Sequence, residues 1–100
     1  VTPALVTDMA VAFMNTLEQN GYYAMYYSNR DFIDHWFDGE RMKSYDFWYA
    51  RPRENAPDLK CGIWQYSFTG SISGINADVD LDVSYKDYPA IMKKAHLNGY

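Results

Sequence analysis

The N-terminal stretch carries apolar side chains at the spacing of one helix face. Thr2 can cap the free amides of a first turn, and Pro3 fits the first helical position. Gly21 tolerates the left-handed geometry that commonly follows a helix. The pattern predicts a one-sided helix that packs against another layer. Its apolar positions recur every three or four residues: Leu5, Val6, Met9, Ala10, Phe13, Met14 and Leu17.

A strand and a second helix are predicted next. Residues 22–27, YYAMYY, form a short apolar run that is typical of a strand covered on both faces. Ser28 and Asp31 are spaced like a capping box, with Asp where Glu is usual. Strand, tight polar turn and helix together make a βα unit. The helix is expected to end at Gly39 and carries its bulky apolar residues on one side: Phe32, Ile33, Trp36 and Phe37.

The second half of the chain alternates strand patterns with polar loops. Strands are predicted at residues 45–50, 62–68 and 78–85, where aromatic and β-branched residues gather. The segments 51–60 and 69–77 are rich in turn-forming residues and are predicted to be loops.

A last helix is predicted over residues 86–98, with Gly99 as its stop. Pro89 belongs in the first turn of that helix, where its missing amide removes no hydrogen bond. The whole order predicts an α/β fold of about four strands, mostly parallel, with outer helices. Four strands that do not close on themselves leave two open sheet edges.

Composition and charge narrow the class of function. The chain is 48% hydrophobic and 18% aromatic, and its many Tyr and Trp side chains suit wet binding surfaces. The net charge is −4 and the bases are scattered, which argues against a nucleic-acid partner, because binding phosphates needs clustered Lys and Arg. No apolar run is long enough to span a membrane. The single cysteine, Cys61, has no partner for an internal disulfide.

Residues 62–85 bring aromatic, amide and acidic side chains together. Asp78, Asp80 and Asp82 take alternate positions and therefore share one face of the predicted strand. Aromatic rings beside carboxylates suit a cleft in which polysaccharides are cleaved. The alternative interpretation is that the three acids form a solvated strand face. A calcium-binding loop is excluded because Val83 stands where that loop requires Gly, so no metal site is predicted.

Four motifs, in this order, resemble those of glycoside hydrolase family 25, the lysozyme-type muramidases: MNTLEQNGYYAMYYSN, YDFWYAR, GIWQYSFTGSISG and VDLDVSY. The resemblance implies a modified β/α barrel of the TIM type. A complete barrel of this kind needs about 200 residues or more. The resemblance therefore implies that residues 1–100 are the C-terminal half of a family 25 catalytic domain, a partial barrel.

The resemblance also assigns site residues. Asp80 matches the Asp of the family's terminal V-D motif, which implies that it contributes a supporting acid to the cleft. The residues that match the family's Y-S/T, W-x-A and W-Q motifs are implied to position substrate. Strand alternation turns Trp64 and Gln65 to opposite sides, so both cannot line the same pocket. The substrate-positioning set is Tyr27, Trp48, Trp64 and Gln65.

The main acid pair of the family, a D-x-E on a central strand, lies outside the matching motifs. The isolated chain is therefore expected to be inactive or nearly so, because the Glu of that pair acts as the acid. A further departure lies after W-x-A, where the family often has an aromatic residue and this chain has Pro52. Pro52 is expected to change the shape of one cleft wall.

The resemblance implies cleavage of the β-1,4 bond after N-acetylmuramic acid in peptidoglycan, with no cofactor. It implies action at the cell wall, by a secreted enzyme or a phage endolysin. Two alternatives of other classes stay open. One is a non-catalytic half-barrel assembly, either a homodimer or a pairing with a complementing N-terminal half. The other is a cell-wall sugar-binding module.

Overall fold

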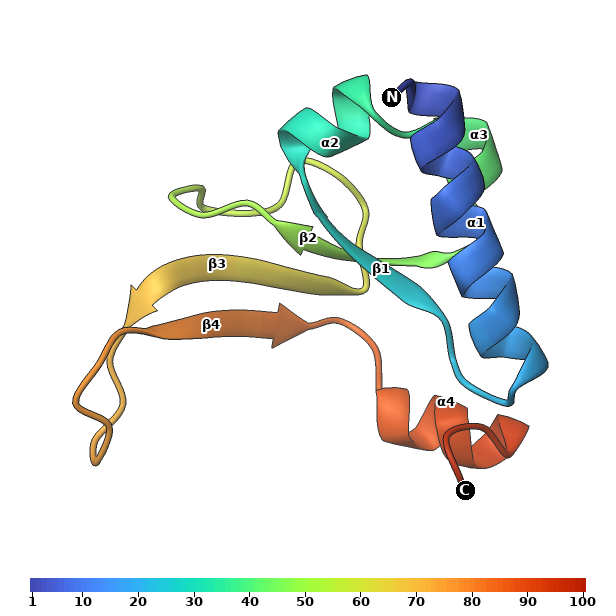
Figure 1. Ribbon diagram of the computed structural model, residues 1–100. Coiled ribbons are helices and arrows are strands. Elements are labelled where there is room, and N and C mark those ends of the chain that lie inside the picture. The colour runs from blue at the N-terminus through green and yellow to red at the C-terminus, as the bar shows by residue number, and fades with distance from the viewer.

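A computed structural model describes residues 1–100, which form four helices and one sheet of four strands. The helices α1, α2 and α3 gather around the first two strands, while β3 and β4 extend away from them (Figure 1). The elements in chain order are α1 (Pro3–Gln19), β1 (Met25–Asn29), α2 (Arg30–His35), α3 (Gly39–Met42), β2 (Asp46–Ala50), β3 (Ile63–Gly70), β4 (Val79–Ser84) and α4 (Tyr88–Ala95).

The first helix forms as the sequence predicts. The hydroxyl of Thr2 accepts a hydrogen bond from the Leu5 amide at 3.2 Å, and Pro3 is the first helical residue. Thr7 and Met14 are buried against the rest of the molecule. The apolar positions on the other side of the helix are exposed, so the predicted apolar face is wider than the face that packs: Leu5, Met9 and Phe13.

The segment after the first helix differs from the prediction in three places. The strand begins at Met25, three residues later than expected, and runs to Asn29. Asn29 caps α2, since its side chain accepts from the Phe32 amide at 3.0 Å, so the predicted cap at Ser28 is wrong by one residue. Gly39 does not end a helix. It begins α3, because the Asp38 side chain caps that short helix.

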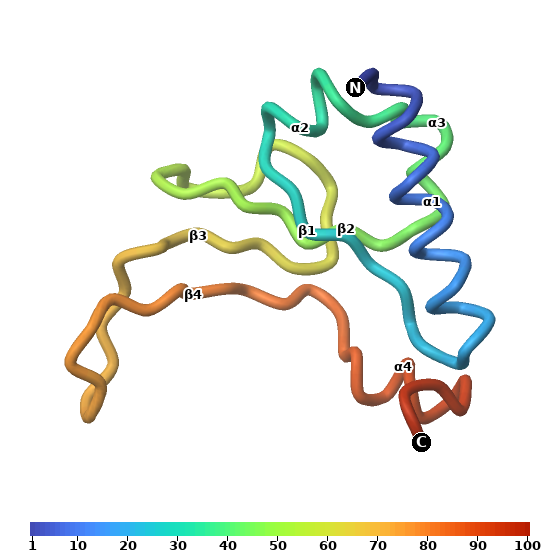
Figure 2. Tube along the Cα trace, in the orientation of Figure 1, coloured from blue at the N-terminus to red at the C-terminus, as the bar shows by residue number.

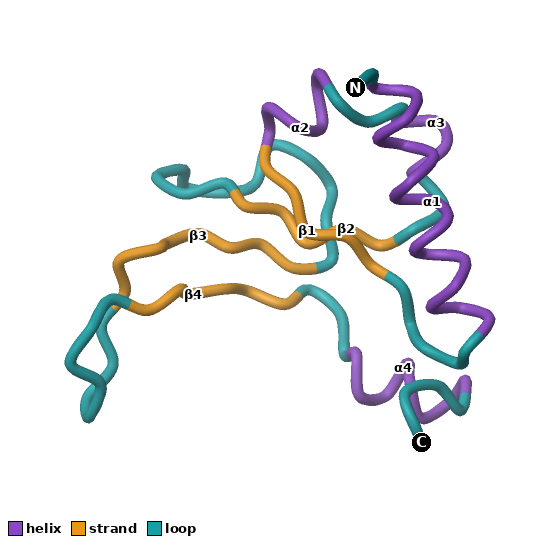
Figure 3. Tube along the Cα trace, viewed as in Figure 1, coloured by secondary structure: helices purple, strands orange, loops and turns teal.

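The sheet has the order β1-β2-β3-β4. β1 pairs with β2 and β2 pairs with β3 in parallel, which confirms a mostly parallel sheet. β3 and β4 are antiparallel and are joined by a hairpin whose loop points away from the helices (Figure 3). The register shifts between β3 and β4 allow the Leu81 side chain to lie against the backbone of Gly70.

The two faces of the sheet differ in chemistry. One face is packed: the rings of Tyr26 and Phe47 stack at 4.9 Å, and Phe37 meets Tyr26 edge-on at 5.6 Å. Strand alternation places Trp64 on this packed face, next to Tyr49. The opposite face carries the other candidate site residues.

The last helix lies beside the turn between α1 and β1 (Figure 2). The Asn98 amide donates to the Gly21 carbonyl at 2.8 Å, and the Asn98 side chain accepts from the Tyr23 amide at 2.8 Å. Asp87 caps α4, and Pro89 lies in its first turn as predicted. The helix ends at Ala95 and is capped by His96 in a left-handed conformation, so it stops short of the predicted end at Asn98. None of the helices is long and apolar enough to cross a membrane.

Candidate functional site

One face of the sheet gathers aromatic, amide and acidic side chains from all four strands. Tyr27 of β1 lies beside Trp48 of β2, and Gln65 of β3 lies beside Asp82 of β4. Partners in neighbouring strands point to the same side of a sheet. We call this surface the polar face and define it by Tyr27, Trp48, Gln65, Asp80 and Asp82.

Tyr27 and Gln65 form the centre of the polar face. The Tyr27 hydroxyl donates a hydrogen bond to Oε1 of Gln65, whose side chain lies below it and is only 2% exposed. Tyr27 as a whole residue is 53% exposed, and its ring meets Trp48 edge-on, with ring centroids 5.2 Å apart. The buried amide therefore satisfies its oxygen and holds an exposed ring in one orientation.

Trp48 is fixed by a carboxylate two strands away. Its indole Nε1 donates to Oδ1 of Asp82 at 2.8 Å, across β3. Asp82 is one of the three alternating acids, but the family resemblance singles out Asp80 instead. The alternation itself was the signal that Asp82 shares this face.

Asp80 lies on the exposed surface of β4, and its partner in the alternation, Asp78, precedes the strand. Burial raises the pKa of the Tyr27 hydroxyl, and the negative charges of Asp80 and Asp82 raise it further, while the hydrogen bond to Gln65 lowers it. The net pKa is raised, so Tyr27 stays protonated at neutral pH and acts as a hydrogen-bond donor.

Trp64 is not brought together with the other predicted site residues. It is 8% exposed on the packed face, and its Nε1 donates to the Arg51 carbonyl at 3.0 Å. Gln65 points the opposite way, as strand alternation predicted. The structure thus unites Tyr27, Trp48 and Gln65 and separates Trp64 from them.

A hollow of about 400 Å³ opens at the carboxyl ends of β1 and β2. Tyr27 forms part of its lining and connects it to the polar face. Pro52, the residue that departs from the family pattern, stands in its wall with Phe32 and Phe68. Ligands of α/β sheets commonly bind at the carboxyl ends of parallel strands.

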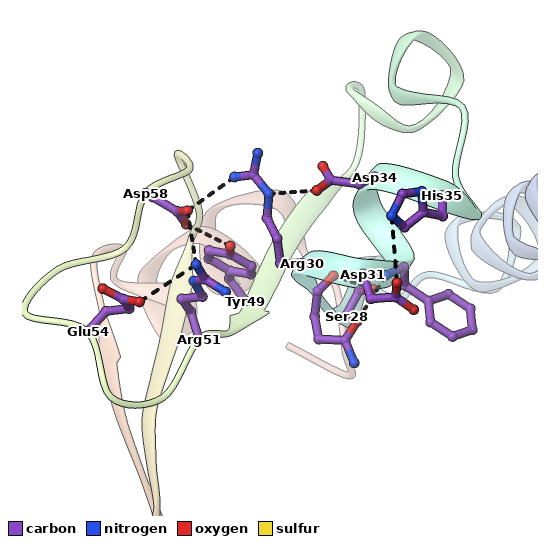
Figure 4. Close-up of polar contacts among 11 residues, drawn as sticks. Ser28, Arg30, Asp31, Asp34, His35, Tyr49, Arg51, Glu54 and Asp58 are labelled. Atoms are coloured by element: carbon purple, nitrogen blue, oxygen red, sulfur yellow. Dashed lines mark hydrogen bonds and ion pairs between the residues drawn. The ribbon is translucent and has the colours of Figure 1, made fainter.

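A polar cluster holds the loop that carries Pro52 (Figure 4). The fully buried Tyr49 donates from its hydroxyl to Oδ1 of Asp58 at 2.6 Å, and Arg30 donates to Oδ2 of Asp58 at 3.2 Å. The pKa of Asp58 is lowered, mainly by the hydrogen bond from Tyr49 and further by the positive charges of Arg51 and Arg30. These contacts join residues 51–60 to β2 and α2.

A largely buried carboxylate, that of Asp46, lies at the amino end of β2. Oδ2 of Asp46 accepts from Tyr23 at 2.7 Å, from Tyr88 at 2.8 Å and from Lys86 at 3.1 Å. Burial pushes the pKa of Asp46 up, but the hydrogen bonds from Tyr23 and Tyr88, from the Phe47 amide and from Lys86 outweigh it and hold the pKa below its usual value. Burial and the bond to Asp46 raise the pKa of Tyr23 to about 12.

The chain contains a single D-x-E triplet, Asp38-Gly39-Glu40. It lies at the start of α3 and not on a strand. Asp38 accepts from the Glu40 amide at 3.0 Å, and the Glu40 carboxylate pairs with Lys43 at 2.7 Å. The triplet therefore serves as a helix cap, and its letters alone do not supply an acid pair to the polar face. No group of three or more His, Cys, Asp or Glu side chains is placed to hold a metal ion.

A mostly parallel sheet with outer helices and one aromatic, acidic face defines a mixed α/β protein. Residues 1–75 match the sequence profile of glycosyl hydrolases family 25, and the chain belongs to that family. A search of curated proteins found no match.

The fold is similar to that of a solved endolysin. The structure of the CTP1L endolysin, described as revealing how the activity of that protein is regulated by a secondary translation product, aligns with a TM-score of 0.76 and 24% identity. The alignment covers 88% of this chain and 33% of that one, so this chain spans about a third of the endolysin's length. At this identity the similarity establishes the fold.

Proposed function

We propose that residues 1–100 are part of the catalytic domain of a peptidoglycan-hydrolysing lysozyme, in which the polar face is one wall of the cleft. Membership of glycosyl hydrolases family 25 and similarity of fold to an endolysin support this function. The observation that carries it is a pair of neighbouring rings on one sheet face, Tyr27 hydrogen-bonded to Gln65 and Trp48 hydrogen-bonded to Asp82. Rings held by amides and carboxylates are suited to stack on sugars.

The roles we propose follow from where each side chain lies. Tyr27 and Trp48 offer ring surface to the sugars next to the β-1,4 bond that follows N-acetylmuramic acid. Asp80, exposed on the same face, supplies a supporting negative charge for the developing positive charge of the sugar. Gln65 is buried and acts through Tyr27. We propose that Trp64 supports the substrate-positioning residues by packing beneath the sheet, because it is buried on the packed face.

We further propose that the sheet is the C-terminal part of a modified β/α barrel of the TIM type. Only 13 of the 100 residues are buried. The radius of gyration is 15.2 Å, whereas a compact domain of this length has a radius of about 13 Å. The sheet also leaves β1 and β4 as open edges. A complementing N-terminal half would cover these edges and complete the cleft.

This proposal makes the isolated chain catalytically inert, because the polar face holds no D-x-E acid pair. Loss of general-acid catalysis alone removes roughly 10²- to 10⁴-fold in rate. The test is the loss of turbidity of a cell-wall suspension on addition of the purified chain. We expect no lysis above buffer. Lysis at the rate of a typical lysozyme would show that the chain holds a complete catalytic set.

Binding of cell-wall sugar by the chain alone is a separate outcome, which the exposed rings of the polar face favour. Co-sedimentation with purified insoluble peptidoglycan measures it directly. We expect Trp48→Ala to reduce the bound fraction, since the ring surface is lost. Retention of the chain by the pellet without any change in Trp48→Ala would place sugar binding elsewhere.

A homodimer is the second candidate, and the exposed apolar stripe on α1 favours it. Leu5, Met9 and Phe13 lie four residues apart and are 48%, 64% and 63% exposed. Such a stripe can pack in the antiparallel manner of two-fold interfaces. Light scattering decides the matter. A dimer that dissociates in Met9→Glu supports the assembly, and a monomer at all concentrations excludes it.

A further inference from the structure

A second hollow lies at the amino end of β2, at the opposite end of the strands from the first hollow. It has a volume of about 450 Å³ and lies where β2 begins, just before β3 and just after β4. Three of the five lysines of the chain line it. We call it the lysine hollow and define it by Lys43, Ser44, Lys60, Cys61 and Lys86.

The sign of the charge in the lysine hollow is opposite to that of the chain. The whole chain has a net charge of −4. Asp46 is the only acid among the residues that line the hollow, against three lysines. Its side chain is 7% exposed and already accepts from Tyr23, Tyr88 and Lys86, so that its charge is satisfied from within the fold. Two positive charges, on Lys43 and Lys60, are left facing the space.

Neither of these two lysines is committed to a strong partner. Lys60 is exposed and takes part in no ion pair. Lys43 pairs with Glu40, but the two side chains are 69% and 83% exposed. Exposed pairs of this kind are worth about 0–1 kcal/mol and exchange readily. The ammonium groups are therefore free to turn towards a ligand.

We propose that the lysine hollow binds an oxyanion, the phosphate or carboxylate group of an acidic ligand. Lys43 and Lys60 supply compact positive charges with several donors each, which suit a phosphate or carboxylate that arrives from solvent. The Ser44 hydroxyl makes no hydrogen bond within the chain and offers a neutral donor beside them. The lysine hollow and the hollow next to Tyr27 lie at opposite ends of the strands. The anion site is therefore independent of the proposed cleft.

Cys61 provides a reporter inside the hollow. It is the only cysteine of the chain and is partly exposed. The experiment follows the rate at which neutral iodoacetamide modifies Cys61, in increasing inorganic phosphate or in increasing acetate, with ionic strength held constant by sodium chloride. We expect saturable protection by at least one of the two anions. Protection by phosphate identifies a phosphate ligand, and protection by acetate alone identifies a carboxylate ligand.

The lysine variants make the test specific. The double variant Lys43→Ala/Lys60→Ala is expected to need about tenfold more anion for the same protection, because two exposed charge contacts are lost. The matched control, Lys93→Ala/Lys94→Ala, removes two lysines of α4 that lie outside the hollow and is expected to behave as the wild type. Thermal melting by circular dichroism confirms that both variants are folded. No protection beyond that of chloride, or equal protection in the Lys43→Ala/Lys60→Ala variant, would overturn the proposal.

Discussion

At the scale of single residues, Asp46 and Gln65 hydrogen-bond to side chains that are distant in sequence. Asp46 receives hydrogen bonds from Tyr23, Tyr88 and Lys86, which lie 23 to 42 residues away. Gln65 accepts from Tyr27, 38 residues away. These pairings depend on the sheet register and could not be predicted from local patterns.

Asp82 gives the first residue-scale prediction, because it is the only acceptor for the Trp48 indole. Asp82→Ala is expected to lower the free energy of unfolding by about 1 kcal/mol and to shift the tryptophan fluorescence. Asp82→Asn keeps an oxygen acceptor and is expected to lose less. Denaturant unfolding followed by fluorescence measures both changes. Equal loss in the two variants would mean that the hydrogen bond does not hold the ring.

The second residue-scale prediction concerns Gly62, which packs directly against the side chains of Asp46 and Tyr88. A Cβ at this position would lie 1.8 Å from the Tyr88 hydroxyl and 2.5 Å from Oδ1 of Asp46. Gly62→Ala is therefore expected to destabilise the fold by about 2 kcal/mol. Gly39→Ala is the matched control, because no atom lies within 4 Å of its Cβ position. Urea unfolding of both variants checks the difference, and similar midpoints would contradict the packing described.

Asp46 itself gives a prediction about pH. Its pKa is lowered in the folded state, so the ionised carboxylate stabilises the fold above the unfolded pKa of about 3.9. That stability is lost as the pH falls through the lower, folded pKa. Asp46→Asn is expected to be much less stable than the wild type at pH 7 and to approach it at the lowest pH. A difference in unfolding free energy that stays constant from pH 7 to pH 2 would be inconsistent with this.

At the scale of elements, local signals predicted helix α1 well and the segment after it poorly. Thr2 and Pro3 act within one turn, and both lie where the sequence placed them. Tyr23 lies in an aromatic run that is typical of a strand. Its amide, however, donates a hydrogen bond to the side chain of Asn98, 75 residues away, and the strand starts only at Met25. Gly39 looks like a stop because glycine commonly ends helices, yet the cap at Asp38 makes it a start.

The contact between α4 and the α1–β1 turn depends on Asn98. Its side chain and its backbone amide each hydrogen-bond to that turn, and its φ of 54° lies in the left-handed region. Asn98→Ala is expected to cost about 1–2 kcal/mol, from the lost hydrogen bond and the strain on alanine at positive φ. Hydrogen exchange of the α4 amides is the measurement, with Asn76→Ala in the exposed hairpin loop as the control. Unchanged exchange in α4 would show that the helix is held by other contacts.

At the scale of the whole molecule, the sequence predicted a mixed α/β fold and the family, and the structure shows which of the predicted site residues lie together. The mostly parallel four-stranded sheet and the family match agree with the motifs read along the chain. Trp64 shows the limit of motif transfer: it belongs to the W-Q motif, but strand alternation buries it on the packed face. Asp82 shows the reverse, because its bond to Trp48 is visible only when β2, β3 and β4 are assembled.

The central claim is that the polar face recognises cell-wall sugar. Isothermal titration of the purified chain with a soluble fragment of alternating N-acetylglucosamine and N-acetylmuramic acid tests it most directly. We expect saturable binding that is weakened several-fold in Trp48→Ala, since an aromatic ring contact is worth about 0.5–1.5 kcal/mol. Trp36→Ala, which removes a tryptophan next to α2, should leave binding unchanged. Absence of binding, or equal weakening in both variants, would contradict the account.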